Sequence, residues 1–160
     1  MSIIIKPMET DAEVRGKAYV HWKCWQETYR GMVSQAYLDR FTLEKSEENA
    51  FRWLDNILVA KDGERVIGFV GYGDHGAEEP DVGEIFALYV LPEYQGMGIG
   101  WRLMEAGLKE LSAFPKICLW SLRDNARAIR FYEKWGFRRD GAEKFVPRLE
   151  AAGIRMTKEK

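Results

Sequence analysis

Three glycines occupy alternate positions, Gly96, Gly98 and Gly100, directly before a stretch whose apolar residues recur at helical spacing. The first N–H groups of a helix lack intrahelical partners, and the helix dipole favours an anion beside them. Glycine has no side chain, so its backbone can approach a ligand closely. The pattern therefore predicts a phosphate-binding turn, with a flexible turn that binds nothing as the alternative. No Lys-Ser or Lys-Thr pair follows, which excludes a P-loop, and the third glycine comes one residue early for G-x-G-x-x-G.

A second stretch carries polar residues that could complete such a site. Residues 117–122 are apolar and predict a buried strand. Asp124 or Asn125 can cap a helix that follows, and Gly136 lies where a helix can end in the left-handed conformation. Tyr132 lies inside this expected helix.

The two motifs, Gln95-x-x-Gly98-x-Gly100 and Asn125-x-x-Ala128-x-x-x-Tyr132-x-x-x-Gly136-Phe137, together resemble the acetyl-CoA site of the GCN5-related N-acetyltransferase (GNAT) superfamily. The resemblance is strong over residues 84–137, and it indicates a bacterial-type member with one domain. It implies that the pyrophosphate of acetyl-CoA lies on the glycine turn and that the pantetheine arm pairs with the strand before it. The residues that it places against acetyl-CoA are Leu88, Tyr89, Val90, Gln95, Gly96, Met97, Gly98, Ile99, Gly100, Asn125, Ala128 and Tyr132.

Acetyl transfer from a thioester to an amine needs a proton donor for the leaving thiolate and a way to deprotonate the amine. Given the resemblance, Tyr132 is the candidate general acid, and Asn125 would hold the pantetheine amide or a water. A phenol titrates near ~10 and a thiol near ~8.5, so a hydrogen bond from Tyr132 to the departing sulfur is reasonable. Glu84 is the candidate base, directly or through a water. The alternatives are that Tyr132 is a core aromatic residue, that Asn125 only caps its helix, and that Glu84 is a solvated carboxylate.

An aromatic stripe near the N-terminus is the candidate wall for the acceptor amine. Its candidate residues are His21, Trp22, Trp25, Gln26 and Tyr29. The aromatic ones recur at spacings of three and four, so they share one face of the expected helix. The run Trp25-x-x-Thr28-Tyr29-x-Gly31 resembles the same part of many bacterial GNAT proteins thought to act on small amines or amino-acid derivatives. We therefore expect Trp25 and Tyr29 to contact the substrate, with a purely structural core stripe as the alternative.

These residues predict an N-acetyltransferase that moves an acetyl group from acetyl-CoA directly to a primary amine of a small molecule or peptide. A protein lysine or N-terminal acetyltransferase is an alternative within the same fold. A non-catalytic module that senses acetyl-CoA is a second alternative, although such a module needs neither Tyr132 nor Glu84. A nucleotide-binding α/β domain is a third, and ATP rather than CoA would then protect it against heat.

The composition fits one cytoplasmic domain over residues 1–160, with 46% hydrophobic and 13% aromatic residues. A net charge of -1 without a basic stripe argues against nucleic acid, and no apolar run approaches membrane-spanning length. Cys24 and Cys118 cannot make a disulfide framework and predict reduced, buried thiols. His21 and Cys24 are two ligands only and His75 is far along the chain, so we expect no metal.

The elements that must position these residues follow one another in a mixed order. Strands are expected at 3–5, 57–61, 65–73, 84–90, 117–122, 137–145 and 154–158, and helices at 10–30, 34–41, 42–53, 101–111 and 125–135. This order fits an α/β (α+β) architecture, a mixed central sheet of about seven strands with helices on both faces, which is also the GNAT arrangement. Exposed strands near the C-terminus make a homodimer plausible.

Overall fold

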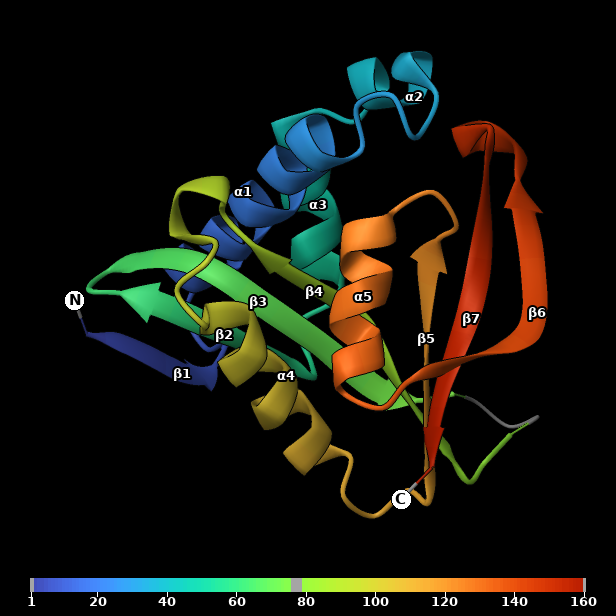
Figure 1. Cartoon of the computed structure of the whole chain (residues 1–160). Helices are drawn as coiled ribbons and strands as arrows, with labels where there is room; N and C mark the ends of the chain where they lie inside the picture. Colours follow the sequence, from blue (N-terminus) through green and yellow to red (C-terminus); the bar gives the residue numbers. More distant parts are fainter. Residues whose placement is uncertain (1, 76–78, 160) are drawn as a thin grey trace.

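The computed structural model describes residues 2–75 and 79–159, and within them it has a seven-stranded sheet with helices on both faces (Figure 1). The strands are β1 (Ile3–Pro7), β2 (Ile57–Asp62), β3 (Arg65–Asp74), β4 (Val82–Val90), β5 (Lys116–Leu122), β6 (Arg138–Val146) and β7 (Ala151–Glu159). The helices are α1 (Asp11–Thr28), α2 (Gln35–Arg40), α3 (Leu43–Arg52), α4 (Ile99–Glu110) and α5 (Ala126–Lys134), with 3₁₀ turns η1 (Pro92–Tyr94) and η2 (Pro147–Leu149). The predicted architecture is confirmed.

The sheet has the strand order β1-β2-β3-β4-β5-β7-β6, in which β4 and β5 alone are parallel. Parallel neighbours need a crossover connection, and α4 provides it. The pairing of β4 with β5 stops at Ile85 and Leu119, although β4 continues to Val90 and β5 to Leu122. The two strands therefore separate toward their carboxyl ends.

A capping box fixes the start of α1. The Thr10 hydroxyl accepts a hydrogen bond from the Glu13 N–H, and the Glu13 carboxylate accepts one from the Thr10 N–H. Lys6 of β1 and Lys61 of β2 also donate to this carboxylate, at 2.8 and 3.0 Å. Burial alone would raise the pKa of Glu13, but the hydrogen bonds outweigh it and lower the pKa to about 2. The carboxylate thus joins α1 to the edge of the sheet.

Neighbouring residues of β3 pack against helices on opposite faces. Phe69 faces α1, where the Lys17 ammonium lies 4.8 Å from its ring centroid and the His21 ring centroid lies 6.0 Å away. Val70 faces α4, and a Cβ built on Gly107 would lie only 3.1 Å from its Cγ2. A glycine at this position lets α4 lie close to the sheet, which fixes the glycine turn at the start of α4. Figure 1 shows α4 and α5 on one face and α1 and α3 on the other.

A small apolar cluster joins two segments that are far apart in sequence, the α1–α2 connection together with α2, and the β6–β7 turn. Val33, Leu38 and Leu149 are its buried members. The Ser34 N–H donates to the Leu149 carbonyl at 2.6 Å. These segments therefore meet beside the carboxyl ends of β4 and β5.

Candidate active site

Two adjoining cavities occupy the region where β4 and β5 separate. The loop cavity, about 480 Å³, is lined by the glycine turn, the end of β4 and one face of α5. The strand cavity, about 210 Å³, is lined by β4, β5, the aromatic end of α1 and the β6–β7 turn. Six residues line both: Tyr29, Leu88, Tyr89, Asn125, Ala128 and Tyr132. The cavities therefore meet between β4, α1 and α5.

The glycine turn presents free backbone to the loop cavity. Gly96 and Gly98 have φ angles of 80° and 79°, and no heavy atom lies within 4 Å of a Cβ built on either. Gly98 is the N-cap residue of α4, so the first N–H groups of that helix have no intrahelical acceptor. Positive φ, open space and free donors are the properties that a turn needs to hold a diphosphate.

The edge of β4 offers a second set of backbone groups. The Leu91 N–H donates to the Ile67 carbonyl of β3 at 2.9 Å. Because backbone groups alternate in direction along a strand, those of Tyr89 also point toward β3, whereas those of Leu88 and Val90 point toward the gap. The Val90 carbonyl accordingly accepts from the Gln95 side chain at 3.2 Å. An extended amide-containing chain could therefore pair with Leu88 and Val90.

Helix α5 brings Asn125 and Tyr132 to the junction of the two cavities. The Asn125 Oδ1 accepts from the Ala128 N–H at 3.3 Å and caps the helix, which leaves the side-chain NH₂ able to donate to a ligand. The Tyr132 hydroxyl has no hydrogen-bond partner within residues 2–75 and 79–159. Burial, and then the nearby Tyr29, raises the pKa of Tyr132, so its phenol stays protonated at neutral pH.

Some aromatic residues of the α1 stripe line the strand cavity, whereas others pack against neighbouring rings. Trp25 Nε1 donates to the Tyr89 hydroxyl at 3.0 Å, and the Tyr29 and Tyr89 hydroxyls are 3.1 Å apart. Trp25 and Tyr29 both line the strand cavity. The His21 ring instead stacks on Tyr89, with centroids 5.5 Å apart, and burial followed by the Lys17 charge lowers the pKa of His21 to about 3.

The predicted cofactor residues all line the loop cavity except Met97, a residue that is 53% exposed. Glu84 lines neither cavity, because its Oε1 lies 2.7 Å from Nδ1 of His75. Ile85, the next residue of β4, does line the strand cavity, so Glu84 lies directly beside the wall of that cavity without forming part of it. Its role as a base stays a prediction.

Sequence reasoning missed several lining residues that have side-chain functions. Arg127, Phe131 and Lys134 line the loop cavity and lie four and three residues apart on α5. Their helical spacing, beside Ala128 and Tyr132, was a usable signal. Trp120 and Lys144 line the strand cavity, and the Lys144 ammonium lies 4.2 Å from the Trp120 ring centroid. That pair depends on the β5-β7-β6 strand order, which local sequence does not reveal.

The family model described as Acetyltransferase (GNAT) family matches residues 18–137, which include both motifs. The chain belongs to this family. An uncharacterized N-acetyltransferase of Archaeoglobus fulgidus is 38% identical to it over 127 residues, covering 73% of this chain and 84% of the relative. The PaiA N-acetyltransferase of Thermoplasma acidophilum, solved in complex with coenzyme A, has a TM-score of 0.77 at 23% identity and covers 100% of both chains. PH1933 of Pyrococcus horikoshii has a TM-score of 0.78 at 25% identity over 99% of both.

This GNAT acetyltransferase is an acyltransferase that uses acetyl-CoA, as the sequence resemblance implied. The loop cavity fits this co-substrate on three observations of the structure. Its glycine turn is open and has N–H groups without an intrahelical acceptor, the β4 edge beyond Ile85 does not pair with β5, and Arg127 and Lys134 add positive charge.

Proposed function

We propose that this GNAT acetyltransferase transfers the acetyl group directly to a primary amine whose body, a small molecule or a peptide end, is apolar or anionic. The observation that carries the proposal is the meeting of the two cavities at Leu88, Asn125 and Tyr132. One cavity has the groups that suit a diphosphate carrier, and the other has an aromatic wall. Reactants held in both would meet at the shared residues.

In the loop cavity, the backbone N–H groups of residues 96–100, including that of Met97, would hold the diphosphate with Gln95 beside it. Arg127 and Lys134 would supply positive charge to the phosphates. Leu88 and Val90 would pair with the amides of the pantetheine arm. Acetyl-CoA supplies an acetyl group already activated as a thioester.

The direction of β4 decides where the thioester would lie. The glycine turn follows the carboxyl end of β4, so the sulfur end of the arm would extend back toward Leu88. The Leu88 N–H would then face the thioester oxygen, and such a donor typically contributes about 3–4 kcal/mol in the transition state. Tyr132 would donate a hydrogen bond to the departing sulfur, and Asn125 would donate to an amide carbonyl of the arm or to a water.

The amine must lose a proton before it can attack. An alkylamine titrates near ~10.4, so its deprotonation at neutral pH costs about 4–5 kcal/mol without a base. Glu84 would assist through water, because it does not itself line the strand cavity, although the next residue, Ile85, does.

The strand cavity favours particular acceptors. Its aromatic lining comprises Trp25, Tyr29, Phe86, Tyr89, Trp120 and Tyr132. Among the described residues, no carboxylate lines the cavity, and Lys144 is its charged member. A polyamine or an aminoglycoside would bring several positive charges to a wall that has no negative partner. An amine with an apolar or anionic body is the better match.

The proposal is tested by thiol release from acetyl-CoA against amines of matched size: polyamines, aminoglycosides, amino-acid derivatives, peptides with a free N-terminus, and lysine peptides. We expect turnover with apolar or anionic α-amines and small amines, and little with polycations. Best turnover with lysine peptides would support the protein-acetylating alternative. No turnover with any amine in the panel, together with tight CoA binding, would support the acetyl-CoA sensor. Best turnover with a polyamine would refute the preference for apolar or anionic acceptors but not acetyl transfer itself.

Several broader predictions remain predictions: a single domain over residues 1–160, a cytoplasmic location, a possible homodimer and no nucleic-acid partner. Within the part of the chain that the structure describes, no helix combines the length and hydropathy that crossing a bilayer requires. Heat protection by CoA but not by ATP would exclude the nucleotide-binding alternative.

A further inference from the structure

Three different metal-binding groups converge where β4 and β5 are still paired. His75 Nδ1 lies 2.7 Å from Glu84 Oε1 and 3.4 Å from Cys118 Sγ, and all three atoms lie within 4.8 Å of one another. Glu84 and Cys118 are direct neighbours in the parallel register of the two strands. From the sequence we expected no metal, because only His21 and Cys24 lay close together along the chain.

The separations suit a tetrahedral ion. Zn²⁺ binds nitrogen and oxygen at about 2.0–2.2 Å and sulfur at about 2.3 Å, which places ligand atoms roughly 3.3–3.6 Å apart in a tetrahedron. The separation of His75 and Cys118 already has this value, and that of His75 and Glu84 would have to open by less than about 1 Å. Small side-chain shifts would therefore admit the ion.

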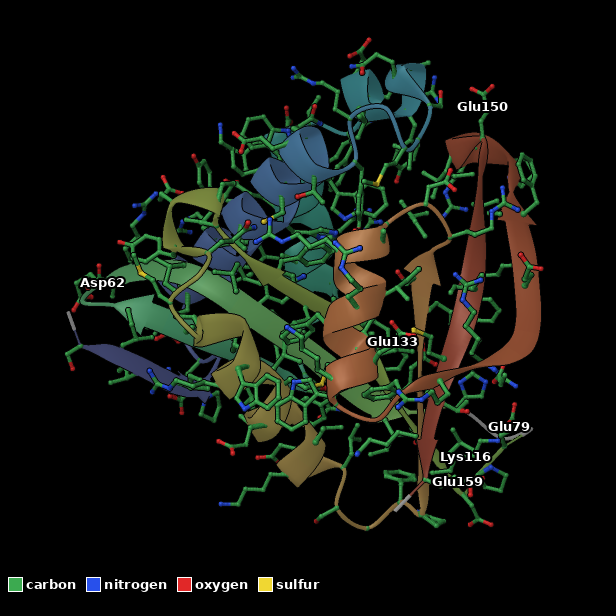
Figure 2. The ribbon with its side chains drawn as sticks, in the orientation of Figure 1. Asp62, Glu79, Lys116, Glu133, Glu150 and Glu159 are labelled. Atoms are coloured by element: carbon green, nitrogen blue, oxygen red, sulfur yellow. The ribbon has the colours of Figure 1, made fainter. Side chains whose placement is uncertain are left out.

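The second ring nitrogen of His75, Nε2, lies near a carboxylate, which is a usual partner for the non-ligating nitrogen of a metal-binding histidine. His75 Nε2 lies 3.5 Å from Glu79 Oε1, and Arg155 donates to the same oxygen at 3.1 Å while also binding Asp140. Figure 2 shows Glu79 beside the lower part of β7, the strand that carries Arg155. A carboxylate at Nε2 holds the tautomer that leaves Nδ1 free for a metal. A neutral imidazole has one N–H and cannot donate to Glu79 and Glu84 at once, whereas an ion at Nδ1 would satisfy both sides.

An ion could reach these groups from solvent. The side chains of His75 and Glu84 are 21% and 13% exposed, whereas Cys118 is buried. Three protein ligands leave one tetrahedral position for water, as in open zinc sites. The mixture of thiolate, imidazole and carboxylate favours zinc over magnesium or calcium.

We propose that His75 Nδ1, Glu84 and Cys118 form a Zn²⁺ site, with Glu79 orienting the histidine. On binding, the thiol proton is released to solvent and the thiolate bonds to the ion. The zinc proposal does not rest on the proposed acetyl transfer, but the two share Glu84. A carboxylate bound to zinc is a weaker base, so zinc would compete with the role proposed for Glu84.

The test uses the full chain, freed of any histidine tag, stripped with a chelator and free of acetyl-CoA. Zn²⁺ is titrated in competition with a chromophoric chelator, and Co²⁺ then serves as a spectroscopic probe. We expect one ion per chain and a thiolate-to-cobalt charge-transfer band. Cys118→Ser should abolish the band and weaken zinc binding at least 10-fold, and Glu79→Gln should weaken binding by about 10–100-fold.

Cys24→Ser is the matched control, because Cys24 is the other buried thiol and lies in the loop cavity. It should leave both the stoichiometry and the cobalt band unchanged. The wild-type cobalt spectrum needs no variant, so it decides the matter even if Cys118→Ser fails to fold. A wild-type chain that binds no stoichiometric zinc, or a cobalt complex without the thiolate band, would overturn the proposal. Neither result would bear on acetyl transfer, which is measured separately.

Discussion

The loop cavity and the strand cavity differ in the kind of group that lines them. The loop cavity depends mainly on backbone groups, from the glycine turn and from the β4 edge beside it. The strand cavity depends on side chains that α1, β4, β5, α5, β6 and η2 contribute. Acetyl-CoA is the same donor for every acceptor, so backbone groups suffice to bind it, whereas side chains distinguish one amine from another. Changes in the loop cavity should therefore alter the KM for acetyl-CoA whichever acceptor is used. Changes in the strand cavity should alter which amine is used.

The largest effect is expected where the two cavities meet. Tyr132→Phe should lower kcat by about 10²–10⁴-fold, because the leaving sulfur loses its proton donor. The dissociation constant for CoA should change little, since the ring remains. Steady-state thiol release and calorimetric titration with CoA measure the two quantities. Tyr19→Phe, outside both cavities, is the control, and a kcat for Tyr132→Phe close to wild type would mean that the ring only packs.

The backbone character of the loop cavity is tested by a pair of glycines. Gly98 and Gly141 have φ angles of 79° and 94°, and a Cβ on either meets no heavy atom within 4 Å. An alanine at each should cost similar stability, because both positions are left-handed. Gly98→Ala alone should raise the KM for acetyl-CoA, by roughly 10- to 100-fold, through backbone strain and loss of space. Equal KM values for the two variants would refute the diphosphate assignment.

This difference between a backbone lining and a side-chain lining also explains what could be predicted from the sequence. The glycine turn and the Asn125–Tyr132 spacing are local, so the motifs identified the loop cavity. The mixed sheet with helices on both faces followed from the order of elements along the chain and from the family resemblance, but the order of strands within the sheet was not predicted. The strand cavity needs segments that are distant in sequence, so Trp120 and Lys144 were missed although Trp25 and Tyr29 were found. The pairing of Glu84 with His75 depends on the loop between β3 and β4 and on the β4–β5 register, which periodicity does not encode.

Side-chain charge in the loop cavity should have a smaller effect than its backbone. Replacing Arg127 and Lys134 together by glutamine should raise the KM for acetyl-CoA by roughly 5- to 10-fold, because both are exposed and salt screens them. The salt dependence of KM should weaken at the same time. Lys109→Gln, on the exposed surface of α4, is the control. Unchanged KM and salt dependence in the double variant would place the phosphates elsewhere.

In the strand cavity, one charge should alter acceptor preference without affecting acetyl-CoA. Lys144→Glu should shift kcat/KM toward cationic amines by roughly 3- to 5-fold, since it replaces a positive charge at the wall with a negative one. The KM for acetyl-CoA should stay constant. Competition between paired acceptors of opposite charge measures the shift. Parallel changes for both acceptors would show that Lys144 does not contact the amine's body.

The smallest effect concerns how the stability of the protein depends on pH through His21, which packs against Tyr89 in the wall of the strand cavity. Burial and Lys17 lower the pKa of His21 from 6.5 to about 3, so the unfolded chain binds an extra proton between these values. His21 therefore makes the protein less stable as pH falls from 6.5 toward 3. His21→Phe should flatten this decline in Tm, by about 2–4 °C for each kcal/mol recovered. Thermal melts of both proteins from pH 7 to 4 measure it, and parallel curves would show that His21 is protonated in the fold.

The most direct test of the central claim is a crystal structure of the full chain with a non-reactive thioether analogue of acetyl-CoA. We predict the diphosphate oxygens within hydrogen-bond distance of the N–H groups of residues 96–100, and the sulfur beside the Tyr132 hydroxyl. A diphosphate bound away from this turn, or a Tyr132 phenol turned into the interior of the protein, would contradict the account.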